Sequence, residues 1–451
     1  MKSLRIWSSS PKCLWHSIIR LTVPSLMVAV FIFKFVLLDD NLDTVKAVSQ
    51  GDTHAYQNKL LRGSVFLQQE KESASSTPQE RGGRHMVEGT HGRSQKDLYG
   101  PAAKADIAFK QRYADADVAL RLASLGLDRV DESEAPALGP KIVGWDEKRQ
   151  ALLSRNTAQA GGRSLRHKIL LVTGSSSKPC KNAFGDHILL QFTKNKMDYC
   201  RLHGIDFFYS MALLNPGMDD CWSKLPVIRK LMLSHPEVEW IWWMDSNAAF
   251  TDMTFKLPME RYAQYNLVLH GWDDDIYLKK SWVGLNAGVF LIRNCQWSLD
   301  LMDAWARMGK DKQLRERLGP FFSEILVSRP AFEGDDQASL IFILNNQKEI
   351  WESKVYFENS FYLHGHWGLL VGNYEKLMQS SHPGYGDDRW PFVTHFVGCE
   401  PCGPQSLEGS TCLKQMERAF NFADNQVLHF YGFEHIDLNK FEVGPVGNKS
   451  T

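Results

Sequence analysis

The chain has 451 residues, of which 43% are hydrophobic and 23% are charged, and its 52 basic side chains are balanced by 52 acidic ones. This length can hold one large domain, or two smaller ones with additional segments. A formal net charge of zero gives no reason to expect a nucleic acid or another polyanion as a partner.

An apolar segment near the N-terminus, residues 21–38, predicts a membrane-spanning helix. A spanning helix needs about 20 mainly apolar residues, and "LTVPSLMVAVFIFKFVLL" comes close to that. Basic residues precede the segment and Asp39, Asp40 and Asp43 follow it, so the positive-inside rule places residues 1–20 in the cytosol. No small-residue cleavage site follows, which favours a retained type II anchor over the alternative of a cleaved signal peptide.

Residues 39–139 predict a lumenal stem that is largely disordered. The stretch "QQEKESASSTPQERGGRHMVEGTHGRSQKD" is polar and poor in large aliphatic residues, and such a composition buries too little apolar surface to offset the entropy of ordering. The segment 102–127 has some helical periodicity and is expected to form an isolated amphipathic helix.

From about residue 140, apolar strand patterns alternate with helical ones. Strands are expected in "HKILLVTGSS", "IDFFYSM" and "EVEWIWWMD", and helices in "HILLQFTKNKMDYCRLHG" and "CWSKLPVIRKLMLSHP". This alternation predicts an α/β fold with parallel strands and right-handed crossovers. Ligands bind beyond the carboxyl ends of such strands, so we expect Thr173-Gly174 and Asp245-Ser246-Asn247 to line one crevice.

The Asp245-Ser246-Asn247 turn is a candidate metal site. Oxygen ligands at a strand end suit a hard divalent cation, which can hold a diphosphate and neutralise its charge. An aspartate after a strand is also a common turn former or helix cap. That second interpretation is favoured for Asp252.

Eight cysteines are present, and all but Cys13 follow the apolar segment. A lumenal compartment permits disulfides, and because seven is an odd number at least one of these cysteines stays unpaired. Cys399, Cys402 and Cys412 have no second CxxC pair beside them, so a structural disulfide is favoured over zinc or redox chemistry.

Segments spread over residues 139–435 resemble glycosyltransferase family 34, the plant type II enzymes that include xyloglucan α-1,6-xylosyltransferases and galactomannan α-1,6-galactosyltransferases. They include "LLVTGSSSKPC", "WSKLPVIRKLMLSHPEVEWIWWMDSNAAFTDM", "GLNAGVFLIRNC", "FEGDDQASLIFIL" and "YLHGHWG". "YLHGHWG" and "FEGDDQ" resemble the xylosyltransferase branch more closely. The resemblance implies a GT-A fold, Rossmann-like with a mainly parallel central sheet, over residues 140–440, followed by a C-terminal tail at 441–451. It also implies a UDP-sugar donor, Mn²⁺, retention of anomeric configuration, and a Golgi membrane location in which related transferases pair.

The resemblance carries roles to individual positions. It implies metal ligation by Asp245, Asn247 and His395, and a catalytic loop of Asp335, Asp336 and Gln337. The residues it implies for donor binding are Thr173, Gly174, Asp198, Tyr199, Asn286, Ala287, Gly288, His364, Gly365 and Glu400. Structural alternatives stay open: a core histidine for His395, a solvated turn for the Asp pair, and a solvated helix face for Lys224 and Arg229, which could otherwise reach phosphate.

Two positions depart from the family pattern. Asn247 stands where the family has a second metal carboxylate, and Glu400 stands where it has a lysine that contacts the diphosphate. One charge interaction at 4 Å is worth about 4 kcal/mol at an effective dielectric constant near 20, so a reversed charge weakens donor binding unless the loop moves. That Glu400 replaces the missing carboxylate is a further interpretation.

Several functions therefore remain open. The first is a xyloglucan 6-xylosyltransferase that moves xylose from UDP-xylose to O6 of glucose in a β-1,4-glucan. The second is a catalytically poor member that serves as a non-catalytic subunit of a Golgi xyloglucan-synthesis complex. A galactomannan galactosyltransferase that uses UDP-galactose and a glycan-binding protein without turnover complete the set. Use of the Asn448 glycosylation sequon also stays open.

Overall fold

The computed structural model describes residues 115–125, 137–159, 168–218, 220–403 and 407–447. All of these belong to the second of two units of the chain, Tyr56–Thr451. The predicted anchor at 21–38 and most of the predicted stem lie outside the described residues and stay predictions. Within the described ranges, no helix is both long and apolar enough to cross a membrane.

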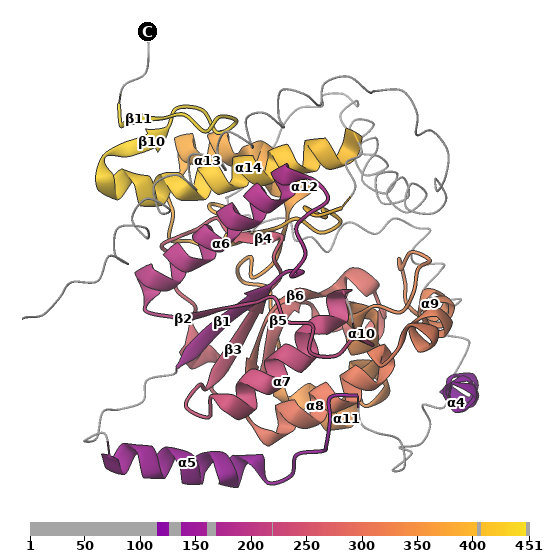
Figure 1. Ribbon diagram of the computed structural model, residues 1–451. Helices are drawn as coiled ribbons and strands as arrows, with labels where there is room; N and C mark the ends of the chain where they lie inside the picture. Colours follow the sequence, from indigo (N-terminus) through magenta and orange to yellow (C-terminus); the bar gives the residue numbers. More distant parts are fainter. Residues whose placement is uncertain (1–114, 126–136, 160–167, 219, 404–406, 448–451) are drawn as a thin grey trace, which may run out of the picture. The chain divides into compact units, whose positions relative to one another are not determined.

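The described residues are built around a six-stranded sheet with the order β2-β1-β3-β6-β5-β7 (Figure 1). Its strands are β1 (Ile169–Gly174), β2 (Asp206–Ser210), β3 (Trp240–Met244), β5 (Leu267–Gly271), β6 (Leu285–Arg293) and β7 (Val355–Glu358). β1 pairs in parallel with β2 and β3, and β5 pairs in parallel with β7. β6 runs antiparallel to both of its neighbours. The expected parallel crossovers are therefore confirmed, and the sheet as a whole is mixed.

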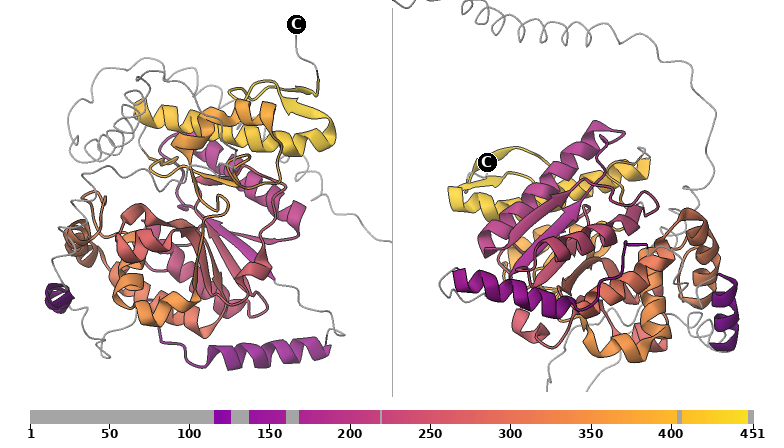
Figure 2. Two further views of the ribbon diagram at one scale, coloured as in Figure 1. Left: turned by 180° about the vertical axis from the view of Figure 1, so that it is seen from behind. Right: turned by 60° about the horizontal axis from the view of Figure 1, so that its bottom comes forward.

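The predicted helices α6 (Ala183–His203) and α7 (Lys224–Ser234) cover opposite faces of this sheet (Figure 2). Successive side chains of a strand point to opposite faces. Accordingly, Ile241 and Trp243 of β3 join an apolar cluster with α7, α8 (Gln296–Ala306), α9 (Lys312–Ile325) and α10 (Asp336–Asn346). Trp240, Trp242 and Met244 join a second cluster on the α6 side. All five residues of β3 are buried, as expected for a strand covered on both faces.

A second, three-stranded sheet extends the carboxyl end of β3. It consists of β4 (Ala248–Phe250), β9 (Val393–His395) and β8 (Gly365–His366), in the order β4-β9-β8. β4 pairs antiparallel with β9, with Ala248 opposite His395. The chain leaves β3 through Asp245–Asn247 and enters β4 directly, so this pairing brings His395 beside Asp245 although 150 residues separate them.

The remaining elements surround these sheets. The helices are α4 (Asp115–Ser124), α5 (Trp145–Gln159), α11 (Lys348–Trp351), α12 (Trp367–Leu370), α13 (Tyr374–Ser380) and α14 (Leu407–Leu428), and the last strands are β10 (Phe433–His435) and β11 (Val443–Pro445). Short 3-10 turns are η2 (Asp220–Ser223), η3 (Met259–Tyr262), η5 (Trp282–Gly284), η6 (Arg307–Gly309), η7 (Glu352–Lys354), η8 (Val371–Asn373) and η9 (His429–Tyr431), and η4 (Asp274–Leu278) is a π turn.

Of the helix expected at 102–127, the described residues 115–125 contain α4. One predicted boundary changes. The expected C-terminal tail from residue 441 contains β11, which pairs antiparallel with β10. Residues 443–445 therefore belong to the folded part of the chain.

Two disulfides lie near the carboxyl end of β1. Cys180 pairs with Cys402, and Cys399 pairs with Cys412. The predicted structural role of the Cys399–Cys412 segment is thereby confirmed. Of the cysteines in the described ranges, Cys200, Cys221 and Cys295 remain free thiols, which agrees with the odd number.

Candidate active site

The turn after β3 presents Asp245 at the edge of the sheet. Its backbone N–H donates to the carbonyl oxygen of Gly288 at 2.9 Å, which fastens the turn to β6. The indole N–H of Trp243 donates to Oδ1 at 2.6 Å. The Asp245 side chain is still 31% exposed, so its second oxygen is available to a ligand.

His395 and Asn247 lie beside this carboxylate. Nε2 of His395 is 3.9 Å from Oδ2 of Asp245 and 3.1 Å from Oδ1 of Asn247. Nδ1 of His395 is 3.0 Å from Nδ1 of His364. Burial lowers the pKa of His395 to about 4, although Asp245 opposes this shift, so the ring is neutral at pH 7 and one of its nitrogens can accept.

A buried lysine joins this turn to the predicted catalytic loop. Nζ of Lys224, on α7, lies 2.8 Å from Oδ2 of Asp336 and 3.5 Å from Oδ1 of Asp245, and it donates to the carbonyl of Ala287 at 2.9 Å. Burial alone lowers the pKa of Lys224, but the two carboxylates outweigh it and raise the pKa above its ordinary value. Burial raises the pKa of Asp336 to about 6 against the effect of Lys224. Neither of the two roles first considered for Lys224, a phosphate contact or a solvated face, describes this position.

The start of β6 and Gln337 complete the network. Oε1 of Gln337 accepts from the N–H of Ala287 at 3.2 Å, and Nε2 donates to the carbonyl of Trp282 at 2.8 Å. Oδ1 of Asn286 accepts from the N–H of Gly288 at 2.9 Å. A Cβ atom at Gly288 would lie 2.4 Å from Cε1 of His395 and 2.5 Å from Oδ2 of Asp245. Only a glycine lets β6 approach the Asp245–His395 pair this closely.

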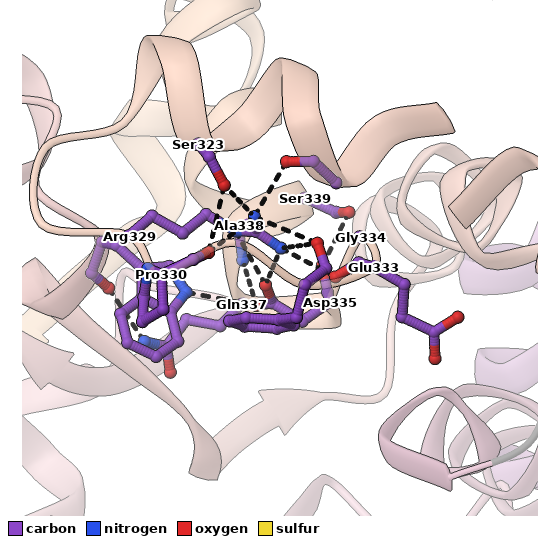
Figure 3. A network of polar contacts seen from close by, with 12 residues as sticks. Ser323, Arg329, Pro330, Glu333, Gly334, Asp335, Gln337, Ala338 and Ser339 are labelled. Carbon is purple, nitrogen blue, oxygen red and sulfur yellow. Dashed lines mark hydrogen bonds and ion pairs between the residues drawn. The ribbon is translucent and has the colours of Figure 1, made fainter. Parts of the chain in front are cut away.

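Asp335 has a structural role as the N-cap of α10 (Figure 3). Oδ1 accepts from the N–H of Ala338 at 2.7 Å and from the indole of Trp282 at 3.3 Å. Oδ2 accepts from Nε and Nη2 of Arg329 at 3.1 and 2.9 Å. With both oxygens engaged, this carboxylate positions the loop and has little capacity left for a substrate.

The residues expected on the donor side divide into two groups. Gly174 and His364 are partly exposed at the carboxyl end of the sheet. Thr173 is fully buried, and its hydroxyl has no hydrogen-bond partner among the described residues. Gly365 lies in the β8–β9 pair, where an added Cβ would be 2.7 Å from the carbonyl of Val393. Thr173 and Gly365 are thus buried positions and not exposed donor contacts.

Asp198 and Tyr199 lie elsewhere. α6 begins at the crevice with its N-cap Asn182 and runs away from it, and both residues are near its far end. Asp198 pairs with Lys194 at 2.8 Å. Tyr199 has no exposed surface, stacks on Phe250 and donates its hydroxyl to the carbonyl of Phe255 at 2.8 Å. The expected donor-binding role of Tyr199 is therefore corrected to a core position.

Glu400 belongs to a loop that the two disulfides frame, Phe396–Gly403. The side chain is exposed, yet partial desolvation by the loop, together with Asp220, raises the pKa of its carboxyl, and Lys181 opposes this shift. Lys181 follows Cys180, whose disulfide partner Cys402 belongs to this loop. The acidic residue is thus accompanied by a cation on the facing segment.

The predicted metal ligands form a set with one carboxylate, one amide oxygen and one imidazole. Within the described ranges, no group of three or more His, Cys, Asp and Glu side chains is arranged to hold a metal. Of the predicted ligands, only Asp245 and His395 are of these types, because Asn247 is an amide. Their donor atoms nevertheless converge, with separations of 3.1 and 3.9 Å from Nε2 of His395, and oxygen and imidazole donors suit Mn²⁺. The three residues therefore fit a divalent ion, with Asp245 as the only negatively charged ligand among them.

Two buried lysines belong to the site: Lys224 was considered only as a possible phosphate contact, and Lys196 was not predicted at all. Lys196 is 1% exposed and donates to the carbonyl of Ala248 at 2.6 Å, underneath the Asp245 turn. Burial lowers its pKa to about 7, although Asp245 opposes this. Helical periodicity could have predicted that both lysines are buried. Lys196 lies four residues after Phe192 and Lys224 lies four before Ile228, so each is on the buried face of its helix.

Comparison with known proteins gives a consistent picture. The pattern of the galactosyl transferase GMA12/MNN10 family matches residues 165–406. Xyloglucan 6-xylosyltransferases 1 and 2 of Arabidopsis thaliana are each 53% identical, over 323 and 327 residues, which is 71% and 72% of this chain and 70% and 71% of theirs. Probable glycosyltransferase 2 of Oryza sativa subsp. indica is 55% identical over 323 residues, 70% of this chain and 67% of its own. A solved glycosyltransferase involved in the glycosylation of the major capsid of PBCV-1 aligns over 55% of this chain and 99% of its own, with 12% identity and a TM-score of 0.35.

These findings define the class as a glycosyltransferase with a mixed α/β core. The chain belongs to the galactosyl transferase GMA12/MNN10 family, which is glycosyltransferase family 34.

The close approach of β6 to the site gives a first prediction. Gly288→Ala places a methyl group against Asp245 and His395, and overpacking of this kind costs about 1–3 kcal/mol. We expect the variant to lose at least about tenfold in transfer rate or in affinity for UDP with Mn²⁺, because about 1.4 kcal/mol corresponds to a factor of ten. Gly372→Ala is the matched control, since nothing lies within 4 Å of an added Cβ there. Equal activity of the two variants would show that the close approach is unimportant.

Lys196 gives a prediction on pH. Its pKa falls from 10.5 in the unfolded chain to about 7 in the fold, so between these values the unfolded chain binds more protons. The free energy of unfolding should therefore gain a component that rises with pH from about 7 towards 10.5. Lys196→Met removes this component, and urea denaturation at pH 7 and pH 9 measures it.

Lys194→Met is the control for that measurement. The pKa of Lys194, which lies on the same helix, is raised, because hydrogen bonds to Asp198 and Asp424 outweigh the lowering by burial. It stays charged in both states at pH 7 and 9, so its loss should leave the pH slope unchanged. If Lys196→Met also keeps the slope of the unsubstituted chain, Lys196 is charged in the fold at pH 7–9 and the assignment fails.

Proposed function

We propose that this protein transfers xylose from UDP-xylose to O6 of a glucose unit in a β-1,4-glucan, with retention of configuration at the anomeric carbon. The support is its identity of 53% to the two Arabidopsis xyloglucan 6-xylosyltransferases, together with the "YLHGHWG" and "FEGDDQ" segments. In this proposal the core is a GT-A fold, and the crevice at the carboxyl ends of β1 and β3 receives the donor.

One observation carries the proposal: the buried network that joins the Asp245 turn to the catalytic loop is complete. Lys224 contacts Asp245, Asp336 and the carbonyl of Ala287 at once. Gln337 is tied to the N–H of the same Ala287. A chain that had lost the need for a reaction would not have to keep the Asp336 carboxylate and the Lys224 ammonium group buried, since each carries a desolvation cost.

In the proposed site, Mn²⁺ is held by Asp245, His395 and the amide oxygen of Asn247. The ion, when bound, neutralises charge on the departing UDP. Oδ1 of Asn247 accepts a hydrogen bond, so Nε2 of His395 carries the proton in the geometry described above. To offer Nε2 to a cation, His395 would carry its proton on Nδ1 and donate it to Nδ1 of His364 at 3.0 Å, and His364 would then carry its own proton on Nε2.

The carboxylates next to the sugar serve positioning. Asp335 caps α10 and Asp336 pairs with Lys224, so neither is assigned as a covalent nucleophile. We infer that the acceptor hydroxyl attacks on the face from which UDP departs, and that the leaving phosphate takes its proton. Gln337 then supports the anomeric carbon with the remaining lone pair of its amide oxygen.

Two further functions keep specific support. The amide at 247 removes a carboxylate from the metal site, and the acid at 400 places a negative charge where the family has a cation for the diphosphate. Both changes favour a non-catalytic subunit of a Golgi xyloglucan-synthesis complex. The family name favours a galactosyltransferase that uses UDP-galactose. For all three, the apolar segment at 21–38 supports a single-pass type II protein of the Golgi membrane that pairs with related transferases.

The test uses the full chain solubilised in detergent, with Mn²⁺, cellohexaose and either UDP-xylose or UDP-galactose. We expect a product with the mass of one added pentose from UDP-xylose, and at least about a hundredfold loss in Asp245→Asn, since one lost electrostatic contact in a site costs about 3 kcal/mol. Asp387→Asn, on an exposed pair with Arg389, is the control. A hexose adduct would favour the galactosyltransferase, and UDP binding without any product would favour the subunit.

A further inference from the structure

The loop Phe396–Gly403 is fastened by two side-chain amides, one at each end. Nδ2 of Asn247 donates to the carbonyls of Phe396 and Cys399 at 2.9 and 3.2 Å. Nδ2 of Asn182 donates to the carbonyls of Pro401 and Gly403 at 3.1 and 3.2 Å. Four carbonyls of one eight-residue loop are thus bound by two amide groups.

These contacts fix which atom of Asn247 points where. A carbonyl oxygen can only accept, so the atom facing Phe396 and Cys399 must be the NH₂ group. The other amide atom, Oδ1, then faces His395. The backbone of Asn247 joins as well, because its carbonyl accepts from the N–H of Phe396 at 3.0 Å. Asn247 therefore holds the loop with one side of its amide and faces the candidate metal position with the other.

An aspartate could not do the same. An ionised carboxylate has no hydrogen to donate, and in this orientation one of its oxygens would face two carbonyl oxygens. The loop would lose two hydrogen bonds and gain repulsion, and partly buried acceptors left without donors are costly. The loop as built here is matched to an amide at position 247.

We propose that Asn247 is a positioning residue whose amide fastens the Phe396–Gly403 loop, and with it Glu400, to the turn that carries Asp245. The asparagine is then more than a weakened metal ligand. It lacks the charge of a carboxylate, but its NH₂ group forms two hydrogen bonds that hold the loop. The statement about the loop rests on the fold alone. Its consequence for the UDP diphosphate rests on the proposed function.

The test is hydrogen exchange of the loop amides in the metal-free full chain with EDTA present. Asn247→Asp should speed exchange at 396–403 by about tenfold or more, the effect of losing two hydrogen bonds of ordinary strength. Peptides from β5 should exchange at the unchanged rate.

Asn182→Asp is the matched variant. It keeps the N-cap, because Oδ1 of Asn182 accepts from the N–H of Gly185 at 2.7 Å, and it removes the two donors to Pro401 and Gly403. We expect it to speed exchange in the same loop while the affinity for Mn²⁺ alone stays constant. Asn247→Asp should raise that affinity, because it adds a carboxylate to the site.

Unchanged exchange at 396–403 in metal-free Asn247→Asp overturns the proposal and leaves Asn247 as an altered ligand only. If Asn247→Asp does not accumulate as folded protein, Asn247→Ala removes both donors without adding a charge, and faster exchange at 396–403 is again the expected result. A failure of the xylosyltransferase assay would leave the exchange result standing, so the two claims fail separately.

Discussion

The arrangement of this site depends on a single buried ammonium group. Lys224 is 3% exposed, and its Nζ lies among Asp245, Asp336 and the carbonyl of Ala287. Each of these groups comes from a different segment: the turn after β3, the start of α10 and the start of β6. Burying Lys224 or Asp336 without its partner would cost several kcal/mol, whereas Asp245 is partly exposed. Together they fix the spacing between the candidate metal position and the loop that carries Gln337.

Around this charge cluster, the packing of β6, the cap of α10 and the pairing of β4 with β9 position the remaining residues of the site. Gly288 lets β6 pass close to Asp245 and His395, and Arg329 holds Asp335 as a helix cap. The β4–β9 pairing brings His395 from the C-terminal part of the family region. Side chains that resemble catalytic groups in the sequence thus divide into those that face the crevice and those that hold it in shape.

Sequence reasoning predicted the strand–helix succession well because runs such as "WIWWM" are apolar on both faces. It did not predict the antiparallel direction of β6, because periodicity carries no information on direction. The resemblance implies donor binding for Tyr199, yet this residue lies seven residues after the buried Phe192, on the same helix face. Asp335 precedes an apolar helix, a position typical of an N-cap. The disulfide pairing could not be deduced from spacing at all.

The two departures from the family pattern belong to one structural unit. Asn247 and Glu400 are joined through the Phe396–Gly403 loop. Two carbonyls of this loop accept hydrogen bonds from the amide of Asn247. Cys402 of the same loop is bonded to Cys180, which precedes Lys181. A change at one position therefore alters the surroundings of the other, and single substitutions towards the family pattern are not expected to act independently.

The central claim is that Lys224 holds the site together by charge. The most direct measurement is a double-mutant cycle in unfolding free energy over Lys224→Met, Asp336→Asn and the double variant. We predict that Lys224→Met alone costs about 3–5 kcal/mol, because it leaves a buried carboxylate without its partner. The double variant should recover at least about 1 kcal/mol relative to the sum of the single changes. Additivity within about 0.5 kcal/mol would contradict the account.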